Sequence, residues 1–240
     1  MRAVAAAVRP VLLLMVMLLA CRSCGAQSSD YAGPNVLVNG DFSTPAAGQV
    51  PAGPAHWDIP DGLGVQWTVA PGGGQGIRMD TAISEQAMVA QWHKVGNTTW
   101  DIPHAAGNAI AETYGLSLYS QAMPVAAGRS YRITYDFLGP AGGVKLWVRG
   151  YGLHNGEKQR LWEAVVNGTG DGPAWKTTTM DVHPTRHRYA VTELKIMLYA
   201  YYPAGVYWFR NIRLQLLPED QADRDAQAKA AVEAAAAAQP

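Results

Sequence analysis

Apolar and polar residues alternate in several short stretches of the sequence, and this period of two indicates β-strands with one buried face. In SYRITYDF (130–137), Tyr131, Ile133 and Tyr135 fall on one face, while polar residues occupy the other. The stretches 144–152 and 193–201 follow the same pattern, and VYWFRNIRL (206–214) is predicted as the closing strand. Turns rich in Gly and Pro separate these strands. The sequence therefore predicts an all-β domain of two packed sheets, a β-sandwich.

The two ends of the sequence differ from this domain, which we place at residues 35–217 after a short polar linker at 27–34. Residues 218–240 are rich in Ala and contain no aromatic residue, so they favour a helix but offer little surface to bury. We expect a disordered tail or a frayed helix there. Within the domain, AISEQAMVAQW (82–92) fits either a helix or a strand.

Residues 1–26 have the pattern of an export signal. Two arginines precede an apolar run at 11–20, which is shorter than the ~20 residues that a membrane-spanning helix needs. The run ends in LLAC (18–21), which resembles a bacterial lipobox and makes Cys21 a candidate for lipidation. Cleavage after CGA (24–26) is the alternative. We therefore expect an exported protein, either secreted or lipid-anchored at the bacterial cell envelope.

Charge and cysteine content narrow the classes of partner. Lys and Arg total 19, as do Asp and Glu, so no excess of positive charge favours nucleic acid. Membrane contact is expected only through a lipid at Cys21. Both cysteines, Cys21 and Cys24, lie in the predicted leader, so the core and not disulfides is expected to hold the fold.

The stretch NVLVNGDFS (35–43) resembles the opening of the CenC-type carbohydrate-binding modules, a jelly-roll group that contains families 4, 9 and 22. In that family a Trp follows soon after, and Trp57 or Trp67 can take its place. The stretches at 118–140 and 174–182 and the closing strand resemble later parts of the family in the same order. The resemblance covers essentially the whole domain. It implies a galactose-binding-like jelly roll that binds a polysaccharide or glycan.

Two departures from the family pattern concern a structural calcium ion. The family's opening Glu is Ser43 here, and its closing acidic pair is Arg210-Asn211. Calcium prefers several oxygen ligands that include carboxylates. We therefore expect no bound calcium, although Asp41 and backbone carbonyls would remain as ligands. We expect Arg210 to supply the missing positive charge and to pair with Asp41.

The candidate sugar-binding residues are aromatic and cationic side chains, because sugars offer apolar C–H faces ringed by hydroxyl groups. Because side chains alternate along a strand, four of them share one face of the strand at 144–152: Lys145, Trp147, Arg149 and Tyr151. Two more, Tyr199 and Tyr201, lie on the equivalent face of the later strand at 193–201. Trp92 and Trp100, around a long loop at 91–108, could wall the same cleft. The alternative is that loops cover this face and that Trp147 belongs to the core. For Trp162, a core position is favoured over binding.

Catalysis finds little support in the sequence. No HExxH motif, nucleophile elbow or recognisable acid pair occurs, and Pro184 separates His183 from His187, so we predict no catalytic residue and no metal ligand. Whether the protein is an enzyme stays open. The main hypothesis is an exported, non-catalytic module that binds a polysaccharide or glycan by aromatic stacking and can assist a glycoside hydrolase partner. The alternatives are a protein-interaction or cell-envelope structural sandwich without sugar binding, and a small jelly-roll glycoside hydrolase or lyase.

Overall fold

The computed structural model describes residues 33–48, 51–96, 107–140, 144–168, 172–186, 188 and 190–238. The predicted leader with Cys21, most of the linker, and Trp100 lie outside these residues. No helix formed by the described residues is both long and apolar enough to cross a membrane.

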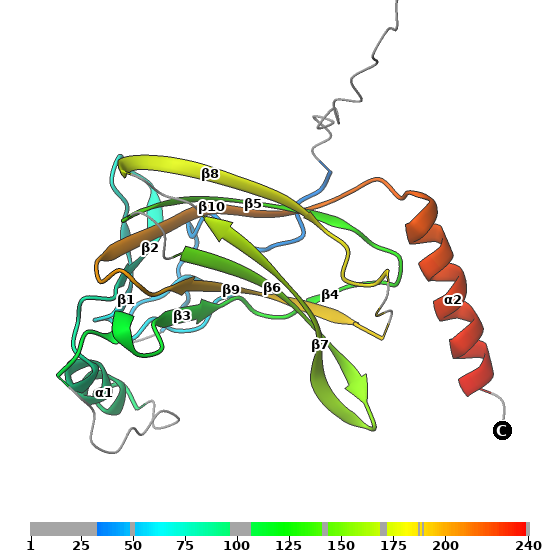
Figure 1. Cartoon of the computed structure of the whole chain (residues 1–240), viewed down its shortest axis with the longest axis horizontal. Coiled ribbons are helices and arrows are strands. Elements are labelled where there is room, and N and C mark those ends of the chain that lie inside the picture. Colours follow the sequence, from blue (N-terminus) through cyan, green and yellow to red (C-terminus); the bar gives the residue numbers. More distant parts are fainter. Residues whose placement is uncertain are drawn as a thin grey trace, which may run out of the picture. The chain divides into compact units, whose positions relative to one another are not determined.

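The first sheet contains five antiparallel strands in the order β1-β2-β10-β5-β8 (Figure 1). Its strands are β1 (Val65–Val69), β2 (Gln75–Asp80), β10 (Val206–Leu216), β5 (Tyr131–Gly139) and β8 (Gly172–Val182). The predicted strands at 130–137 and 206–214 correspond to β5 and β10, which lie side by side in the middle of this sheet.

The second sheet has the order β3-β9-β6-β7. The short strand β4 also pairs with β9, at the start of β9, whereas β3 pairs with the end of β9. Its strands are β3 (Leu116–Tyr119), β4 (Met123–Pro124), β9 (Glu193–Ala200), β6 (Val144–His154) and β7 (Glu157–Gly168). Packing of this antiparallel sheet on the first confirms the predicted two-sheet β-sandwich. The predicted strands at 144–152 and 193–201 are β6 and β9, which pair directly.

One face of each sheet forms the core between the sheets, as the alternation predicted. On β5, Ile133, Tyr135 and Phe137 are 0–1% exposed, while the residues between them are half-buried. On β6, Leu146 and Val148 are fully buried in the same alternating manner. Because side chains of a strand point to opposite faces in turn, these inward residues fix which side chains face outward.

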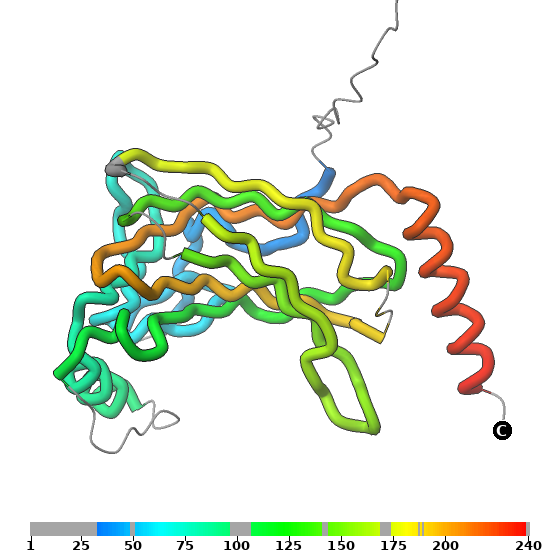
Figure 2. The backbone as a smooth tube through the Cα atoms, in the orientation of Figure 1, coloured from blue at the N-terminus to red at the C-terminus, as the bar shows by residue number. Residues whose placement is uncertain are grey.

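The opening stretch NVLVNGDFS closes the sandwich along β10, although it forms no regular strand (Figure 2). Phe42 is fully buried and fills the core where the opening stretch meets β10. A Cβ on Gly40 would lie 2.0 Å from the Ile212 carbonyl oxygen, so this close approach requires glycine. Alternation along this stretch would place Val36 and Val38 on one face of a strand, but the chain turns here, so Val36 is half-buried and Val38 is exposed.

The ambiguous stretch 82–92 is largely helical. Helix α1 spans Glu85–Lys94, and the Ser84 hydroxyl caps it by accepting a hydrogen bond from the Ala87 N–H. A short 3₁₀ helix, η1 (Ile110–Glu112), leads into β3. In the described residues the long loop therefore begins as a helix that lies near the β3 end of the second sheet (Figure 1).

The Ala-rich C-terminal segment forms helix α2 (Gln221–Ala237). Asp220 and Asp223 make a capping box at its start, and the buried Asp223 carboxylate also accepts hydrogen bonds from Ser130 and Arg186. These contacts attach the first turn of α2 to the sandwich. The rest of the helix is largely exposed, in keeping with its lack of large apolar residues.

Candidate functional site

The outward side chains of the second sheet form a polar and aromatic surface, which we call the outer face. Register places the predicted residues of β6 directly beside β9: the partners are Lys145 and Tyr199, Trp147 and Met197, Arg149 and Lys195, and Tyr151 and Glu193. All four predicted β6 side chains are half-buried, as is Tyr199. The structure therefore brings the predicted residues of the two strands onto one face. The alternative in which Trp147 belongs to the core does not apply.

Arg149 crosses this face from β6 toward β3. Its guanidinium lies 5.2 Å from the Trp147 ring centroid and 5.6 Å from the Tyr119 ring centroid, and it donates a hydrogen bond to the Tyr119 hydroxyl. On its other side, Arg149 Nε lies 3.6 Å from a Glu163 carboxylate oxygen of β7. Met197 is the register partner of both Tyr119 and Trp147. Arg149 thus links two aromatic rings into one strip across three strands.

A second aromatic group lies at the end of β9. The rings of Tyr199 and Tyr201 stack with centroids 5.4 Å apart at 21°, and the Lys145 ammonium lies 4.9 Å from the Tyr201 centroid. The Tyr199 hydroxyl donates to the Tyr114 carbonyl oxygen at 2.8 Å, which fixes the pair against the chain before β3. Tyr201 therefore belongs to the same surface as the strand residues, as predicted.

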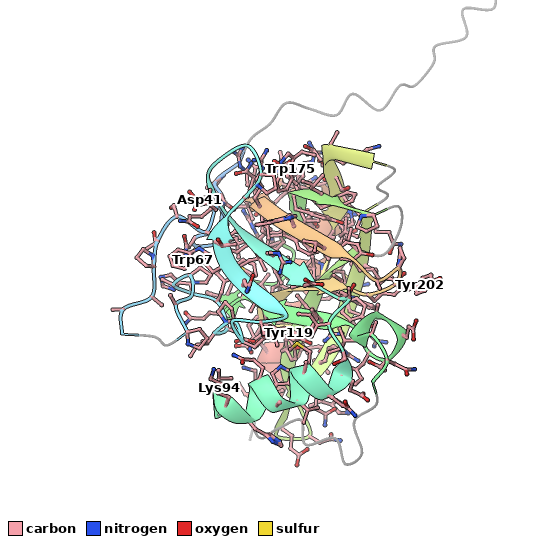
Figure 3. All side chains as sticks on the ribbon, turned by 90° about the vertical axis from the view of Figure 1, so that its left-hand side faces the viewer. Asp41, Trp67, Lys94, Tyr119, Trp175 and Tyr202 are labelled. Atoms are coloured by element: carbon pink, nitrogen blue, oxygen red, sulfur yellow. The ribbon has the colours of Figure 1, made fainter. Side chains whose placement is uncertain are left out.

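A pocket of about 780 Å³ opens onto the outer face at the edge formed by β3. Its lining combines the segment 57–61 and α1 with outward residues of β3, β9 and β6. Among the lining residues are Trp57, Asp58, Asp61, Trp92, Tyr114, Tyr119, Arg149, Met197 and Tyr199. Of the predicted residues, Trp92, Arg149 and Tyr199 line it; Lys145, Trp147, Tyr151 and Tyr201 do not. Figure 3 looks onto this end of the molecule, with Tyr119 near α1.

Backbone contacts hold the wall of the pocket. The Asp58 N–H donates to the Tyr119 carbonyl oxygen at 2.8 Å, so the segment 57–61 runs along the end of β3. The Asp61 carboxylate accepts three backbone N–H groups at 2.7–3.0 Å and shapes the turn into β1. Gln91 of α1 donates to the Asp61 carbonyl oxygen at 2.6 Å. These bonds place Trp92 beside Tyr114, with ring centroids 6.2 Å apart.

Burial in and around the pocket shifts several pKa values. Desolvation raises the pKa of Asp58, and Lys195 partly opposes this shift. Burial also raises the pKa of Asp61, despite its three hydrogen bonds, and that of Tyr119. Burial together with the Glu85 carboxylate raises the pKa of Tyr114 to about 12. The pocket thus offers tyrosine hydroxyls, which stay neutral, and carboxylates. Both kinds of group can form hydrogen bonds with a polar ligand.

The two pocket carboxylates, Asp58 and Asp61, come from one short segment on one wall. Glycoside hydrolysis normally uses two carboxylates that flank the scissile bond. With Asp61 committed to three backbone groups, Asp58 is the carboxylate that a ligand can engage. This arrangement suits hydrogen bonding to sugar hydroxyls better than paired acid–base chemistry.

Sequence reasoning missed Tyr119 and the pocket wall. Leu116 and Leu118 alternate with Ser117 and Tyr119, so the alternation that identified β6 could have placed Tyr119 outward too. Asp58 and Asp61 carry no such signal, because the segment 57–61 has no periodicity. Trp57 and Trp67 were noted only for the family pattern. Their indole N–H groups donate to the Asn39 and Phe42 carbonyl oxygens, so both anchor the opening stretch.

Two further predictions concern Trp162 and Arg210. Trp162 packs partly buried against the core, as favoured. The expected pair between Arg210 and Asp41 is wrong: Arg210 lies 3.6 Å from Asp136 because β10 and β5 are neighbours, and Asp41 accepts a hydrogen bond from Ser43.

Among the residues that the structure describes, no group of three His, Cys, Asp or Glu side chains is arranged to hold a metal ion. The calcium question stays a prediction.

No protein-family model and no curated protein matches the sequence. Solved structures with a similar fold include carbohydrate-binding modules of families 4, 16, 22 and 61, all at low sequence identity. The family 22 xylan-binding domain of Paenibacillus barcinonensis Xyn10C is 14% identical, with 79% of this chain and 98% of that chain covered and a TM-score of 0.46. The family 61 module TmCBM61, solved with β-1,4-galactotriose, is 16% identical over 78% and 99%, with a TM-score of 0.40.

A cyclase from Fischerella sp. TAU is also similar, with 17% identity over 80% of this chain and 99% of that chain and a TM-score of 0.46. The chain spans only 21–28% of three larger structures that it matches, among them a bacteriophage CBA120 tailspike domain. Likeness of this extent concerns the fold alone. Function has to be argued from the side chains of the outer face and the pocket.

Proposed function

We propose that the protein is an exported, non-catalytic sandwich that binds a polysaccharide or glycan on the outer face of the second sheet. The observation that carries the proposal is that this face joins half-buried aromatic rings with donor groups that find no hydrogen-bond acceptor in the described part of the chain. Within the described residues, no group accepts a hydrogen bond from the Trp147 indole N–H or from the Lys145 ammonium. Such groups beside apolar rings suit a sugar, which needs both stacking and hydrogen bonds.

In this proposal the rings carry the stacking and the pocket receives part of the chain of sugars. Trp147 and the Tyr199–Tyr201 pair would contact the apolar faces of successive sugars. Arg149 and Asp58, at the opening of the pocket, would hydrogen-bond hydroxyl groups. A module of this kind would bring a glycoside hydrolase partner to its substrate. Export rests on the leader pattern at 1–26, with secretion or a lipid at Cys21 as its two forms.

A binding titration tests the proposal. Tryptophan fluorescence and calorimetry would follow the protein against soluble glucans, xylans, mannans and galactans. We expect saturable binding to one class and about tenfold weaker binding for Trp147→Ala, because one aromatic contact contributes on the order of 1–1.5 kcal/mol. Trp175→Phe is the control, since Trp175 lies on the outward face of the first sheet and an aromatic ring is kept at its position.

The other outcomes favour the alternative functions. A folded protein that binds none of these glycans would contradict sugar binding and favour a protein-interaction sandwich. Release of reducing ends from a bound glycan, lost in Asp58→Asn, would instead favour a glycoside hydrolase or lyase, because Asp58 is a pocket carboxylate with a raised pKa that is not held by three backbone N–H groups as Asp61 is.

A further inference from the structure

The cations of the outer face differ in whether a carboxylate accompanies them. Arg149 and Arg160 share Glu163, at 3.6 and 3.3 Å, and Lys158 pairs with Glu193. Lys195 faces the Asp58 carboxylate closely enough to lower its pKa. Lys145 is different, because the described residues supply neither a carboxylate nor a hydrogen-bond acceptor to its ammonium group.

The surroundings of Lys145 are neutral and aromatic. Its register partners across the sheet are Tyr199 on β9 and Asn167 on β7, and the next outward residue of its own strand is Trp147. Its ammonium group lies over the Tyr201 ring, 4.9 Å from the centroid. A cation held over an aromatic ring is partly desolvated, and it gains from an anion that completes its coordination.

The stacked tyrosines and Lys145 together match one acidic sugar. An acidic sugar carries its charge at the rim of a ring whose C–H face is apolar. Such a ring can lie on the tyrosine pair while its carboxylate or sulfate reaches the Lys145 ammonium. Arg149 is not the cation for this anion, because the Glu163 carboxylate, 3.6 Å from its Nε, already offsets its charge.

We infer that Lys145, beside the Tyr199–Tyr201 stack, forms a subsite for an anionic sugar, so that the glycan bound by this protein is acidic. This inference rests on the proposed binding of glycans to the outer face. The charged group is a carboxylate or a sulfate, which present the same chemistry to an ammonium group. The subsite lies next to the neutral stacking position at Trp147, two residues along β6, about 6.6 Å away along the strand.

Matched glycans test the subsite. Calorimetry at low ionic strength would compare galactan with the same galactan oxidised at C6 to the uronate and with galactan 6-sulfate, and xylan with glucuronoxylan. We expect an acidic form to bind about fivefold or more tightly than its neutral backbone, with the preference shrinking as salt is added. The uronate and sulfate arms show which anion is preferred.

Substitutions at Lys145 assign the preference to this residue. Lys145→Gln should remove the difference between acidic and neutral forms, and Lys145→Arg should retain most of it. Lys229→Gln, an exposed lysine of α2, is the matched control and should leave the preference unchanged. Equal binding of acidic and neutral forms, or a preference that survives Lys145→Gln, overturns the inference. If binding nevertheless depends on Trp147, the proposed function stands; if no glycan binds at all, both fall.

Discussion

Each sheet of the sandwich presents a tryptophan beside an arginine on its outward face, but the two pairs have different surroundings. On the first sheet, the Trp175 indole N–H donates to the Pro71 carbonyl oxygen at 3.0 Å, and the Arg210 guanidinium lies 3.8 Å from the ring centroid. On the second sheet, the Arg149 guanidinium lies 5.2 Å from the Trp147 ring centroid, and the Trp147 indole N–H has no acceptor among the described residues. Figure 3 shows Trp175 near the turn between β1 and β2, away from Tyr119 and α1.

A carboxylate of the first sheet, Asp136, likewise has internal partners. On the first sheet, Asp136 accepts hydrogen bonds from Thr177 at 2.6 Å and Asn211 at 2.7 Å and lies 3.6 Å from Arg210. On this face Asp136 and the Trp175 indole N–H have internal hydrogen-bond partners, whereas Arg210 Nε finds none among the described residues. The comparison teaches that aromatic and charged composition does not by itself mark a binding surface. What distinguishes the outer face of the second sheet is that the Trp147 indole N–H and the Lys145 ammonium meet no hydrogen-bond acceptor among the described residues.

The largest expected effect is the loss of stability on removing Trp175. Trp175→Ala should lower the free energy of unfolding by about 2–3 kcal/mol, because it removes a half-buried ring, its hydrogen bond to Pro71 and its contact with Arg210. Trp147→Ala should cost about 1 kcal/mol or less, since its indole N–H has no acceptor among the residues that the structure describes. Urea unfolding of both variants measures the difference, and equal losses of stability would contradict the distinction between the faces.

Much of the fold could be predicted because alternation is a local property. The period of two identified β5, β6 and β9, and it placed Lys145, Trp147 and Tyr199 on one side of their sheet. The opening stretch was also informative, since Gly40 and Phe42 are residues that its close packing on β10 requires. Strand order was not available from alternation, which is why Arg210 was expected to meet Asp41 instead of its cross-strand neighbour Asp136.

The pocket could not be predicted because its wall depends on contacts between distant parts of the chain. Asp58 reaches the pocket through a hydrogen bond from its backbone to Tyr119, 61 residues later in the sequence. Nor does sequence distinguish Trp147 from Trp175. Both lie half-buried on outward faces, and only the turn that carries Pro71 makes one of them structural.

A second, smaller effect concerns one carboxylate from each face. Asp136→Ala should lower the free energy of unfolding by about 1–2 kcal/mol, because Thr177, Asn211 and Arg210 lose their common acceptor. Glu163→Ala on the outer face should cost at most ~0.5 kcal/mol, since its side chain is 36% exposed and bridges two arginines at the surface. Chemical denaturation measures both. A larger loss for Glu163→Ala would show that the outer face, and not the first sheet, depends on its ion pairs.

The smallest effect is the response to acid, which should differ in sign between the two sides. The hydrogen bond from Arg132 holds the pKa of Asp181, on the first sheet, below its usual 3.8. This pair therefore stabilises the fold above about pH 4, and its contribution is lost as the pH falls through the lowered pKa. Burial raises the pKa of Asp58, so the folded protein takes up this proton more readily, and protonation of Asp58 favours folding as the pH falls.

Unfolding midpoints in urea at pH 6 and pH 3 test these signs. Asp181→Asn should reduce the loss of stability between the two pH values by ~0.5 kcal/mol at most, because the Asp181 side chain is 39% exposed and water screens the pair. Asp58→Asn should increase the loss, because it removes a group whose protonation favours the folded state. The same change in all three proteins would mean that neither carboxylate has a shifted pKa. A reduced loss in Asp58→Asn would mean that the pocket stabilises the charged form of Asp58, as expected if Lys195 outweighs desolvation.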